Sequence, residues 1–137
     1  MRVATWDSEL IAYVSSPHAF KWGKNDCALM GANWVRECTG VDIAAAFRGH
    51  YTTSRGAVRA LKTHGTGGLV ATMDGLLPSA PLIEGAHRGD LVGLPSPDRL
   101  FDCVVGIAVG DVAAVLGTNG KIAYLPISQI IRIWRVT

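Results

Sequence analysis

The pattern of apolar and polar positions changes along the chain. In the first half, apolar residues recur at the spacing of one face of an amphipathic helix. From Gly89 onwards, short runs rich in valine and isoleucine are separated by glycine-containing turns, which is typical of strands. This order predicts an α+β fold with N-terminal helices packed on a C-terminal antiparallel β-sheet. We expect one domain, residues 1–137, because this length is enough to bury a core.

Caps, stops and turn signals place the individual elements. Gly110-Asp111 and Asn119-Gly120 are turn dipeptides that predict two hairpins. The expected helices are residues 5–16, 27–39, 43–47, 54–64 and 69–77, with Thr5, Asp26, Asp42 and Thr53 or Ser54 as candidate caps. The expected strands are residues 90–94, 103–109, 112–116, 122–125 and 131–136.

The stretch from Trp22 to Gly40 organises the first half of the chain. Asp26 is a good N-cap residue, because its carboxylate accepts hydrogen bonds from free amides of the first helical turn. Cys27 then takes the first helical position, where the positive end of the helix dipole favours the nucleophilic thiolate. The alternative is that Cys27 is a small, buried, apolar side chain.

Composition and charge exclude several classes of protein. Hydrophobic residues make up 49% of the chain and charged residues 18%, so we expect a partner to cover part of the surface. The net charge of +2 and the scattered lysines and arginines argue against nucleic-acid binding. No apolar run approaches the roughly 20 residues of a membrane span. The N-terminus lacks the pattern of a secretion signal, so we expect synthesis in a cytoplasm, with export only inside a larger assembly.

The 3 cysteines exclude a complete disulfide framework. Cys27 and Cys38 lie on one expected helix, roughly 16 Å apart, which is beyond the reach of a disulfide. Cys103 can approach only one of them. The chain has no C-x-x-C pair and no cluster of histidines, so we expect neither a metal site nor a cofactor.

Three short motifs follow one another along the chain: Asp26-Cys27-Ala28-Leu29, Gly89-Asp90-Leu91-Val92 and Val105-Gly106-Ile107. Together they resemble the NlpC-type cell-wall peptidases, papain-like cysteine hydrolases that cut peptidoglycan stem peptides. In that family, Asp-Cys-Ser-Gly places the nucleophile at a helix N-terminus, Gly-Asp-Leu-Val starts the sheet, and a His-Val-Gly-Ile strand supplies the general base. The resemblance implies a papain-like fold, with Cys27 as candidate nucleophile and Asp26 as its helix cap.

A wider pattern covers nearly everything from Phe20 to Val136. It consists of Trp-Gly-x-Asn-Asp-Cys-Ala starting at Trp22, then Phe47-Arg48-Gly49-x-Tyr51, the Gly-Asp strand and a terminal Trp134-Arg135-Val136. This pattern resembles a small group of phage-tail-associated proteins of undefined activity. The resemblance implies a bacteriophage tail protein, located in the virion, with other tail-tip or baseplate proteins as partners.

The chain departs from the peptidases at the general base. Aligning the Val-Gly-Ile segments puts Val104 where the peptidases carry their histidine, and a valine accepts no proton from Cys27. A missing general base costs on the order of 100-fold or more in rate. His87 is the candidate replacement, while Asp102 shares a strand face with Val104 and would raise the pKa of a nearby thiol. Two further histidines that folding can bring close are His18 and His50.

Three functions therefore stay open. The one we favour is a structural part of a phage tail tip with a degenerate active site, because the strand histidine is missing. The alternative is an active cysteine peptidase or amidase that cleaves peptidoglycan stem peptides during phage entry. The third is a thiol acyltransferase or amidase of the bacterial cytoplasm. A histidine within hydrogen-bond reach of Cys27 would favour the alternative.

Overall fold

Helices occupy the first part of the chain and a sheet occupies the second, which confirms the α+β prediction. The computed structural model describes residues 1–137. The helices are α1 (Trp6–Ser15), α2 (Leu29–Thr39), α3 (Ser54–His64) and α4 (Leu69–Leu76). The strands are β1 (Ser79–Ala80), β2 (Leu91–Leu94), β3 (Val104–Ala108), β4 (Val112–Leu116), β5 (Ile122–Pro126) and β6 (Arg132–Trp134), with two 3-10 helices, η1 (Leu82–Glu84) and η2 (Ile127–Gln129), between them.

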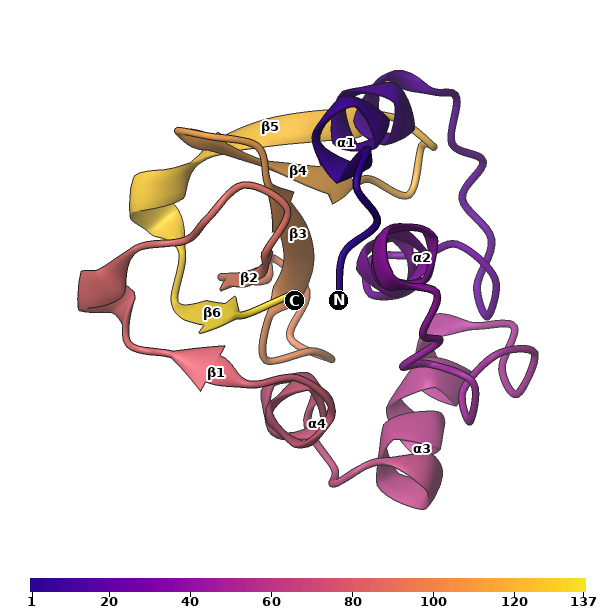
Figure 1. Cartoon of the computed structure of the whole chain (residues 1–137). Helices are drawn as coiled ribbons and strands as arrows, with labels where there is room; N and C mark the ends of the chain where they lie inside the picture. The colour runs from indigo at the N-terminus through magenta and orange to yellow at the C-terminus, as the bar shows by residue number, and fades with distance from the viewer.

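All the strands belong to one antiparallel sheet with the order β1-β6-β2-β3-β4-β5. Both predicted hairpins are present: Gly110-Asp111 joins β3 to β4, and Asn119-Gly120 lies in the turn between β4 and β5. The last strand, β6, returns across the sheet and lies between β1 and β2. This return brings the two chain ends side by side (Figure 1).

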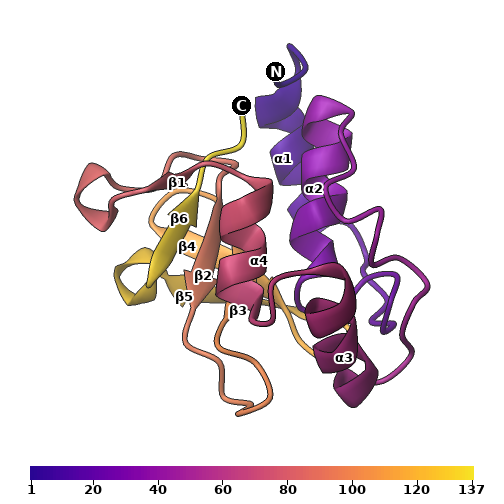
Figure 2. The ribbon, with the colours of Figure 1, turned by 90° about the horizontal axis from the view of Figure 1, so that it is seen from below.

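The helices lie on one side of a strongly curved sheet (Figure 2). A core of 24 buried residues fills the space between helices and sheet, with Trp34 and Trp134 among its largest fully buried side chains. The other face of the sheet carries a second core of 5 buried residues, which includes Val92 and Ile133. The middle of the sheet is therefore buried on both faces, and β2 is buried along its whole length.

Helix α2 lies against the middle of the sheet, and its sequence explains this close approach. A Cβ atom added at Gly31 would lie 3.0 Å from a methyl carbon of Val105, so a larger residue would push α2 away from the sheet. Trp34 on α2 donates its indole N–H to the carbonyl of Gly89 at 2.9 Å. The helix ends at Gly40, whose φ of 79° is the left-handed conformation expected of a helix stop.

Some local predictions are corrected by the structure. The side chain of Thr5 makes no capping hydrogen bond to α1. Residues 43–47 form consecutive turns instead of a helix, although Asp42 accepts a hydrogen bond from the Ala44 amide. The last strand ends at Trp134, before the predicted end of the segment 131–136. The sequence gives no sign of β1, because a two-residue strand has no periodicity to detect.

Candidate functional site

The tight loop before α2 is shaped by the side chain of Asp26. One carboxylate oxygen accepts hydrogen bonds from the amides of Ala28 and Leu29, at 3.1 and 3.0 Å. The other accepts the Gly23 amide at 3.0 Å and the Tyr51 hydroxyl at 2.6 Å. The first two bonds are those of an N-cap residue, and regular α2 begins only at Leu29, later than the sequence predicts.

Glycine at position 23 allows this loop to fold against the segment that follows α2. The φ of Gly23 is 82°, and an added Cβ atom would lie 2.3 Å from the carbonyl oxygen of Tyr51, so no larger residue fits. Next to it, Trp22 stacks on Phe101 with ring centroids 6.2 Å apart. Phe20 meets the Trp22 ring edge-on at 4.9 Å. These aromatic rings pack the loop onto the domain.

Cys27 is half-buried and lines an apolar cavity walled by α2, α3, α4 and the segment between α2 and α3. The cavity has a volume of about 50 Å³, and 15 of its 17 lining residues are hydrophobic, among them Phe47, Leu61 and Met73. The backbone of Cys27 is held against the sheet, because its carbonyl accepts the Val105 amide at 3.3 Å. The backbone of Cys27 is thus fixed at the start of β3, and the residue lines the apolar cavity.

The surroundings of Cys27 favour its neutral form. Burial, and then the neighbouring Asp26 carboxylate, raise the pKa of the Cys27 thiol to about 12. The same two causes raise the pKa of the Tyr51 hydroxyl well above its usual value. The helix dipole was expected to favour the thiolate, but regular α2 begins only at Leu29, and burial and the adjacent carboxylate leave the pKa of the Cys27 thiol raised. A thiol that stays protonated near neutral pH is a weak nucleophile.

The side chain of Val104 lies on the opposite face of the sheet from Cys27. Side chains alternate along β3, so Val105 and Ile107 belong to the core on the helix side, whereas Val104 packs against the smaller core on the other side. The cavity that holds Cys27 lies on the helix side. The position that resembles the peptidase histidine is therefore occupied by valine and turned away from the thiol.

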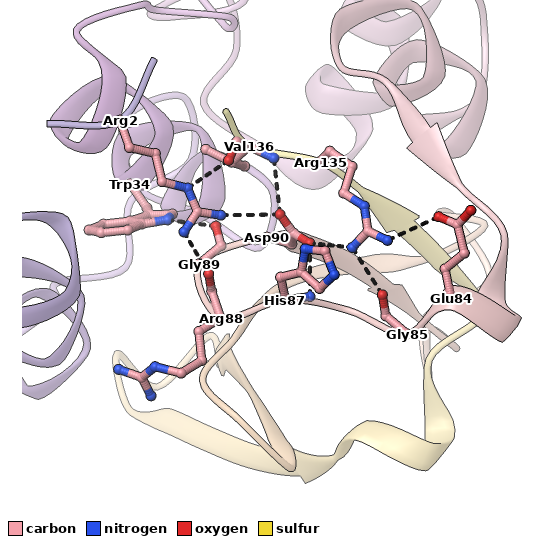
Figure 3. Close-up of polar contacts among 10 residues, drawn as sticks. All are labelled: Arg2, Trp34, Glu84, Gly85, His87, Arg88, Gly89, Asp90, Arg135 and Val136. Atoms are coloured by element: carbon pink, nitrogen blue, oxygen red, sulfur yellow. Dashed lines mark hydrogen bonds and ion pairs between the residues drawn. The ribbon is translucent and has the colours of Figure 1, made fainter.

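The structure does not bring His87 to Cys27. His87 precedes β2, and its backbone amide donates to a carboxylate oxygen of Asp90 at 2.9 Å (Figure 3). It lines a surface hollow together with both chain ends, and none of the residues of that hollow lines the Cys27 cavity. The physical reason is the direction of β2. The backbone of Cys27 contacts β3 at Val105, and Val105 pairs with Gly93 near the end of β2. His87 precedes the start of β2 and therefore lies at the opposite end of that strand.

The remaining histidines also lie elsewhere. A ring nitrogen of His18 lies 2.8 Å from the carbonyl oxygen of Tyr13. The ring of His50 packs on that of His64, with centroids 4.7 Å apart. None of the 17 residues that line the Cys27 cavity is a histidine.

Asp102 has a structural role that the sequence did not indicate. One of its carboxylate oxygens accepts the amides of Leu69 and Val70, at 3.0 and 3.2 Å, so it caps the start of α4 from a distant part of the chain. The next residue, Cys103, is fully buried, and burial followed by Asp102 raises the pKa of its thiol to about 12. All 3 cysteines are free thiols.

A second buried carboxylate, Asp90, joins the two chain ends (Figure 3). One carboxylate oxygen accepts hydrogen bonds from the Val136 amide at 3.1 Å and from the Arg2 guanidinium at 3.2 Å. The other accepts hydrogen bonds from the Arg135 guanidinium at 2.8 Å and from the His87 amide. The signal for this network was the Gly-Asp motif, which the sequence resemblance identified only as the start of a strand.

Two general properties complete the description of the site. No group of three or more histidine, cysteine, aspartate or glutamate side chains is gathered as a metal ion would need. None of the helices combines the length and the apolar character that crossing a membrane requires.

Comparison with known proteins gives one finding. A family model described as a domain of unknown function (DUF6950) matches residues 1–136. Neither the curated proteins nor the solved structures contain a match. Because the family model covers almost the whole chain, the protein belongs to the DUF6950 family.

Proposed function

We propose that this protein is a structural component of a bacteriophage tail, located at the tail tip, with an NlpC-type papain-like fold and a degenerate active site. The tail assignment is supported by the sequence pattern from Phe20 to Val136, which resembles phage-tail-associated proteins. The fold assignment is supported by the order of its motifs and by the α+β architecture with Cys27 just before a helix that lies on the sheet.

The state of Cys27 is the observation that carries the proposal of a degenerate site. Its thiol lies beside the buried Asp26 carboxylate, and its pKa is raised to about 12. A cysteine hydrolase needs the opposite, a thiol whose pKa is lowered by a neighbouring cation or base. The surroundings of Cys27 thus stabilise the loop and suppress the thiolate.

The motif residues also have architectural roles. Arg48, in the Phe-Arg-Gly motif, donates to Asp42 at 2.8 and 2.9 Å and to the side chain of Asn33 at 2.7 Å, which ties the segment after α2 back onto that helix. Trp134, in the terminal motif, donates its indole N–H to Asp74 of α4 at 2.8 Å. These residues hold elements together, as expected of a structural protein.

Two phage variants test the proposal, in a phage whose genome carries this gene. Deleting the gene should give particles with absent or defective tails. Cys27→Ser should leave both particle number and infectivity at the wild-type level, because the thiol performs no chemistry. Cys38→Ser is the matched control for the loss of a buried sulfur atom, since Cys38 lies in the core.

The two parts of the proposal fail separately. Normal tails after deletion of the gene would overturn the tail assignment. Cys27→Ser particles that assemble normally but no longer infect, while Cys38→Ser particles do, would overturn the degenerate site and favour the active peptidoglycan hydrolase.

A further inference from the structure

The outward face of α3 carries a row of three exposed cations, Arg55, Arg59 and Lys62. A helix turns about 100° per residue, so these side chains leave α3 within about 60° of one another. The buried residues Ala57 and Leu61 lie on the opposite face of the helix. In Figure 1 and Figure 2, α3 lies at the edge of the molecule, with the sheet on the other side. We call these three cations the cationic patch.

None of the three cations has a carboxylate partner within the chain. Six other arginines form ion pairs with aspartates or glutamates, but no ion pair involves the cationic patch. The reason lies in the sequence, because residues 43–73 contain four lysines and arginines and no aspartate or glutamate. This segment therefore carries a charge of +4, and since the whole chain carries +2, the remaining residues carry −2. The cationic patch is the exposed part of this charge asymmetry.

The arrangement of the cations does not help α3 to form. Arg55 lies in the first turn, near the positive end of the helix dipole, where a cation is unfavourable. Arg55 and Arg59 are four residues apart, so their like charges repel each other. Of the three, only Lys62 in the last turn suits the dipole. An anion bound from outside would offset both unfavourable terms, so the two arginines are well placed to bind one.

The surface around the cationic patch favours a protein as its partner over a membrane or a nucleic acid. A helix that lies on a membrane inserts an apolar face, whereas the apolar face of α3 is in the core and α3 carries none of the large exposed hydrophobic side chains. Proteins that bind nucleic acids strongly neutralise on the order of 6–10 phosphates. The patch offers three cations, and residues 65–68 after it are uncharged.

We propose that the cationic patch docks on an acidic surface of another protein. The row from Arg55 to Lys62 is about 10 Å long, so the partner presents carboxylates over a similar distance. Each guanidinium group donates two parallel hydrogen bonds to a carboxylate, and the Lys62 ammonium group adds a third charge pair. Such complementary charges orient the encounter and raise its rate. The inference rests on the charges of this chain and not on the proposed tail function.

Fluorescently labelled poly-L-glutamate serves as the probe for an acidic protein surface. Its binding to the full chain is measured by fluorescence anisotropy at low salt, where exposed charge pairs are least screened. In the variant with Arg55→Gln, Arg59→Gln and Lys62→Gln, we expect the Kd to rise roughly tenfold or more, because three exposed ion pairs are lost together. The variant should unfold in urea at the same concentration as the native protein, since the three positions are exposed and unpaired.

The matched control removes three cations from other parts of the chain. Lys21, Arg99 and Lys121 are exposed, form no ion pair and come from three separate segments. Replacing all three with glutamine gives the same net charge as the patch variant. We expect its Kd for poly-L-glutamate to stay within about twofold of the native value. A single-stranded oligonucleotide and vesicles of anionic lipid are the comparison probes, and the native protein should bind both more weakly than poly-L-glutamate.

Three results would overturn the inference. Equal rises in Kd for the patch variant and the control variant would mean that binding follows net charge alone. Tighter binding to the oligonucleotide or to the vesicles would assign the patch to a different class of partner. Dimers in analytical ultracentrifugation that the patch variant no longer forms would make a second copy of the chain the occupant. None of these results bears on the tail assignment, which the phage variants test separately.

Discussion

Two buried aspartates each organise one part of the molecule: Asp26 shapes the loop before α2, and Asp90 joins the two chain ends. The two differ in the charge of the groups that donate hydrogen bonds to them. Asp26 and Asp90 are each 1% exposed, and each accepts four hydrogen bonds. Two of the donors to Asp90 are guanidinium groups, from Arg2 and Arg135. All the donors to Asp26 are neutral: three backbone amides and the hydroxyl of Tyr51.

This difference explains why the two sites affect their neighbours differently. At Asp90 the positive charge of two arginines balances the carboxylate, so the site acts as a clamp between the chain ends. At Asp26 no cation balances the charge, and the carboxylate contributes, after burial, to the raised pKa of both Cys27 and Tyr51. The same residue type therefore joins the chain ends in one place and raises the pKa of a neighbouring thiol in the other.

The largest expected effect is that of Asp90→Ala. The substitution leaves two guanidinium groups, 15% and 16% exposed, without their shared anion. Removing one partner of a buried ion pair costs about 3–5 kcal/mol, so we expect a loss of this size in the free energy of unfolding, measured by urea denaturation. Glu84→Ala is the control, since Glu84 is 58% exposed and an exposed pair contributes about 0–1 kcal/mol. Equal losses in the two variants would contradict the clamp.

Asp26→Asn should have a smaller effect on stability and a distinct effect on Cys27. The amide keeps the shape of the side chain but offers one acceptor oxygen where the carboxylate offers two, so we expect a loss of about 1–3 kcal/mol. Removing the charge should also lower the pKa of the Cys27 thiol part of the way, because burial is the larger cause. Alkylation of Cys27 across a pH series measures this shift. A pKa that does not move would show that the carboxylate has no influence on the thiol.

The smallest effect is expected for Asp102→Ala. Asp102 is exposed, and its two hydrogen bonds cap the start of α4. Loss of such a cap typically costs about 1 kcal/mol, which thermal or urea unfolding can resolve. This variant extends the comparison to a third aspartate, which also accepts hydrogen bonds from backbone amides but is exposed to water. A loss in the free energy of unfolding as large as that of Asp90→Ala would mean that burial and charge pairing do not determine how much each aspartate stabilises the protein.

The order of helices and strands could be predicted because its signals are local. Thr53 caps α3 by accepting the Gly56 amide, and Gly65 follows the helix, as the spacing indicated. Gly110-Asp111 marks a real hairpin because its turn conformation depends on those two residues alone. The turns at residues 43–47 were predicted wrongly as a helix, since three alanines in a row have high helix propensity and the tertiary context of this segment overrides it.

The chemistry of the candidate site depends on contacts between distant residues, and these leave no local signal. Tyr51 meets Asp26 across 25 positions, and Arg2 meets Asp90 across 88. The position of Cys27 at the expected start of a helix left two interpretations open, a thiolate favoured by the local helix dipole or a small buried side chain. Burial and the charge of Asp26 raise the pKa of the thiol, and both arise only when the chain folds.

The alkylation rate of Cys27 as a function of pH tests the central claim most directly, the claim that Cys27 is a neutral thiol beside an unbalanced carboxylate. The native protein is treated with iodoacetamide and each cysteine is followed by mass spectrometry, with a cysteine-containing peptide as the reference for an unperturbed pKa of about 8.5. We expect the rate at Cys27 to be slow and still rising about tenfold per pH unit at pH ~10, since its pKa lies above that range. A fast reaction that levels off below the midpoint of the reference peptide would contradict the claim, and would identify Cys27 as an activated nucleophile.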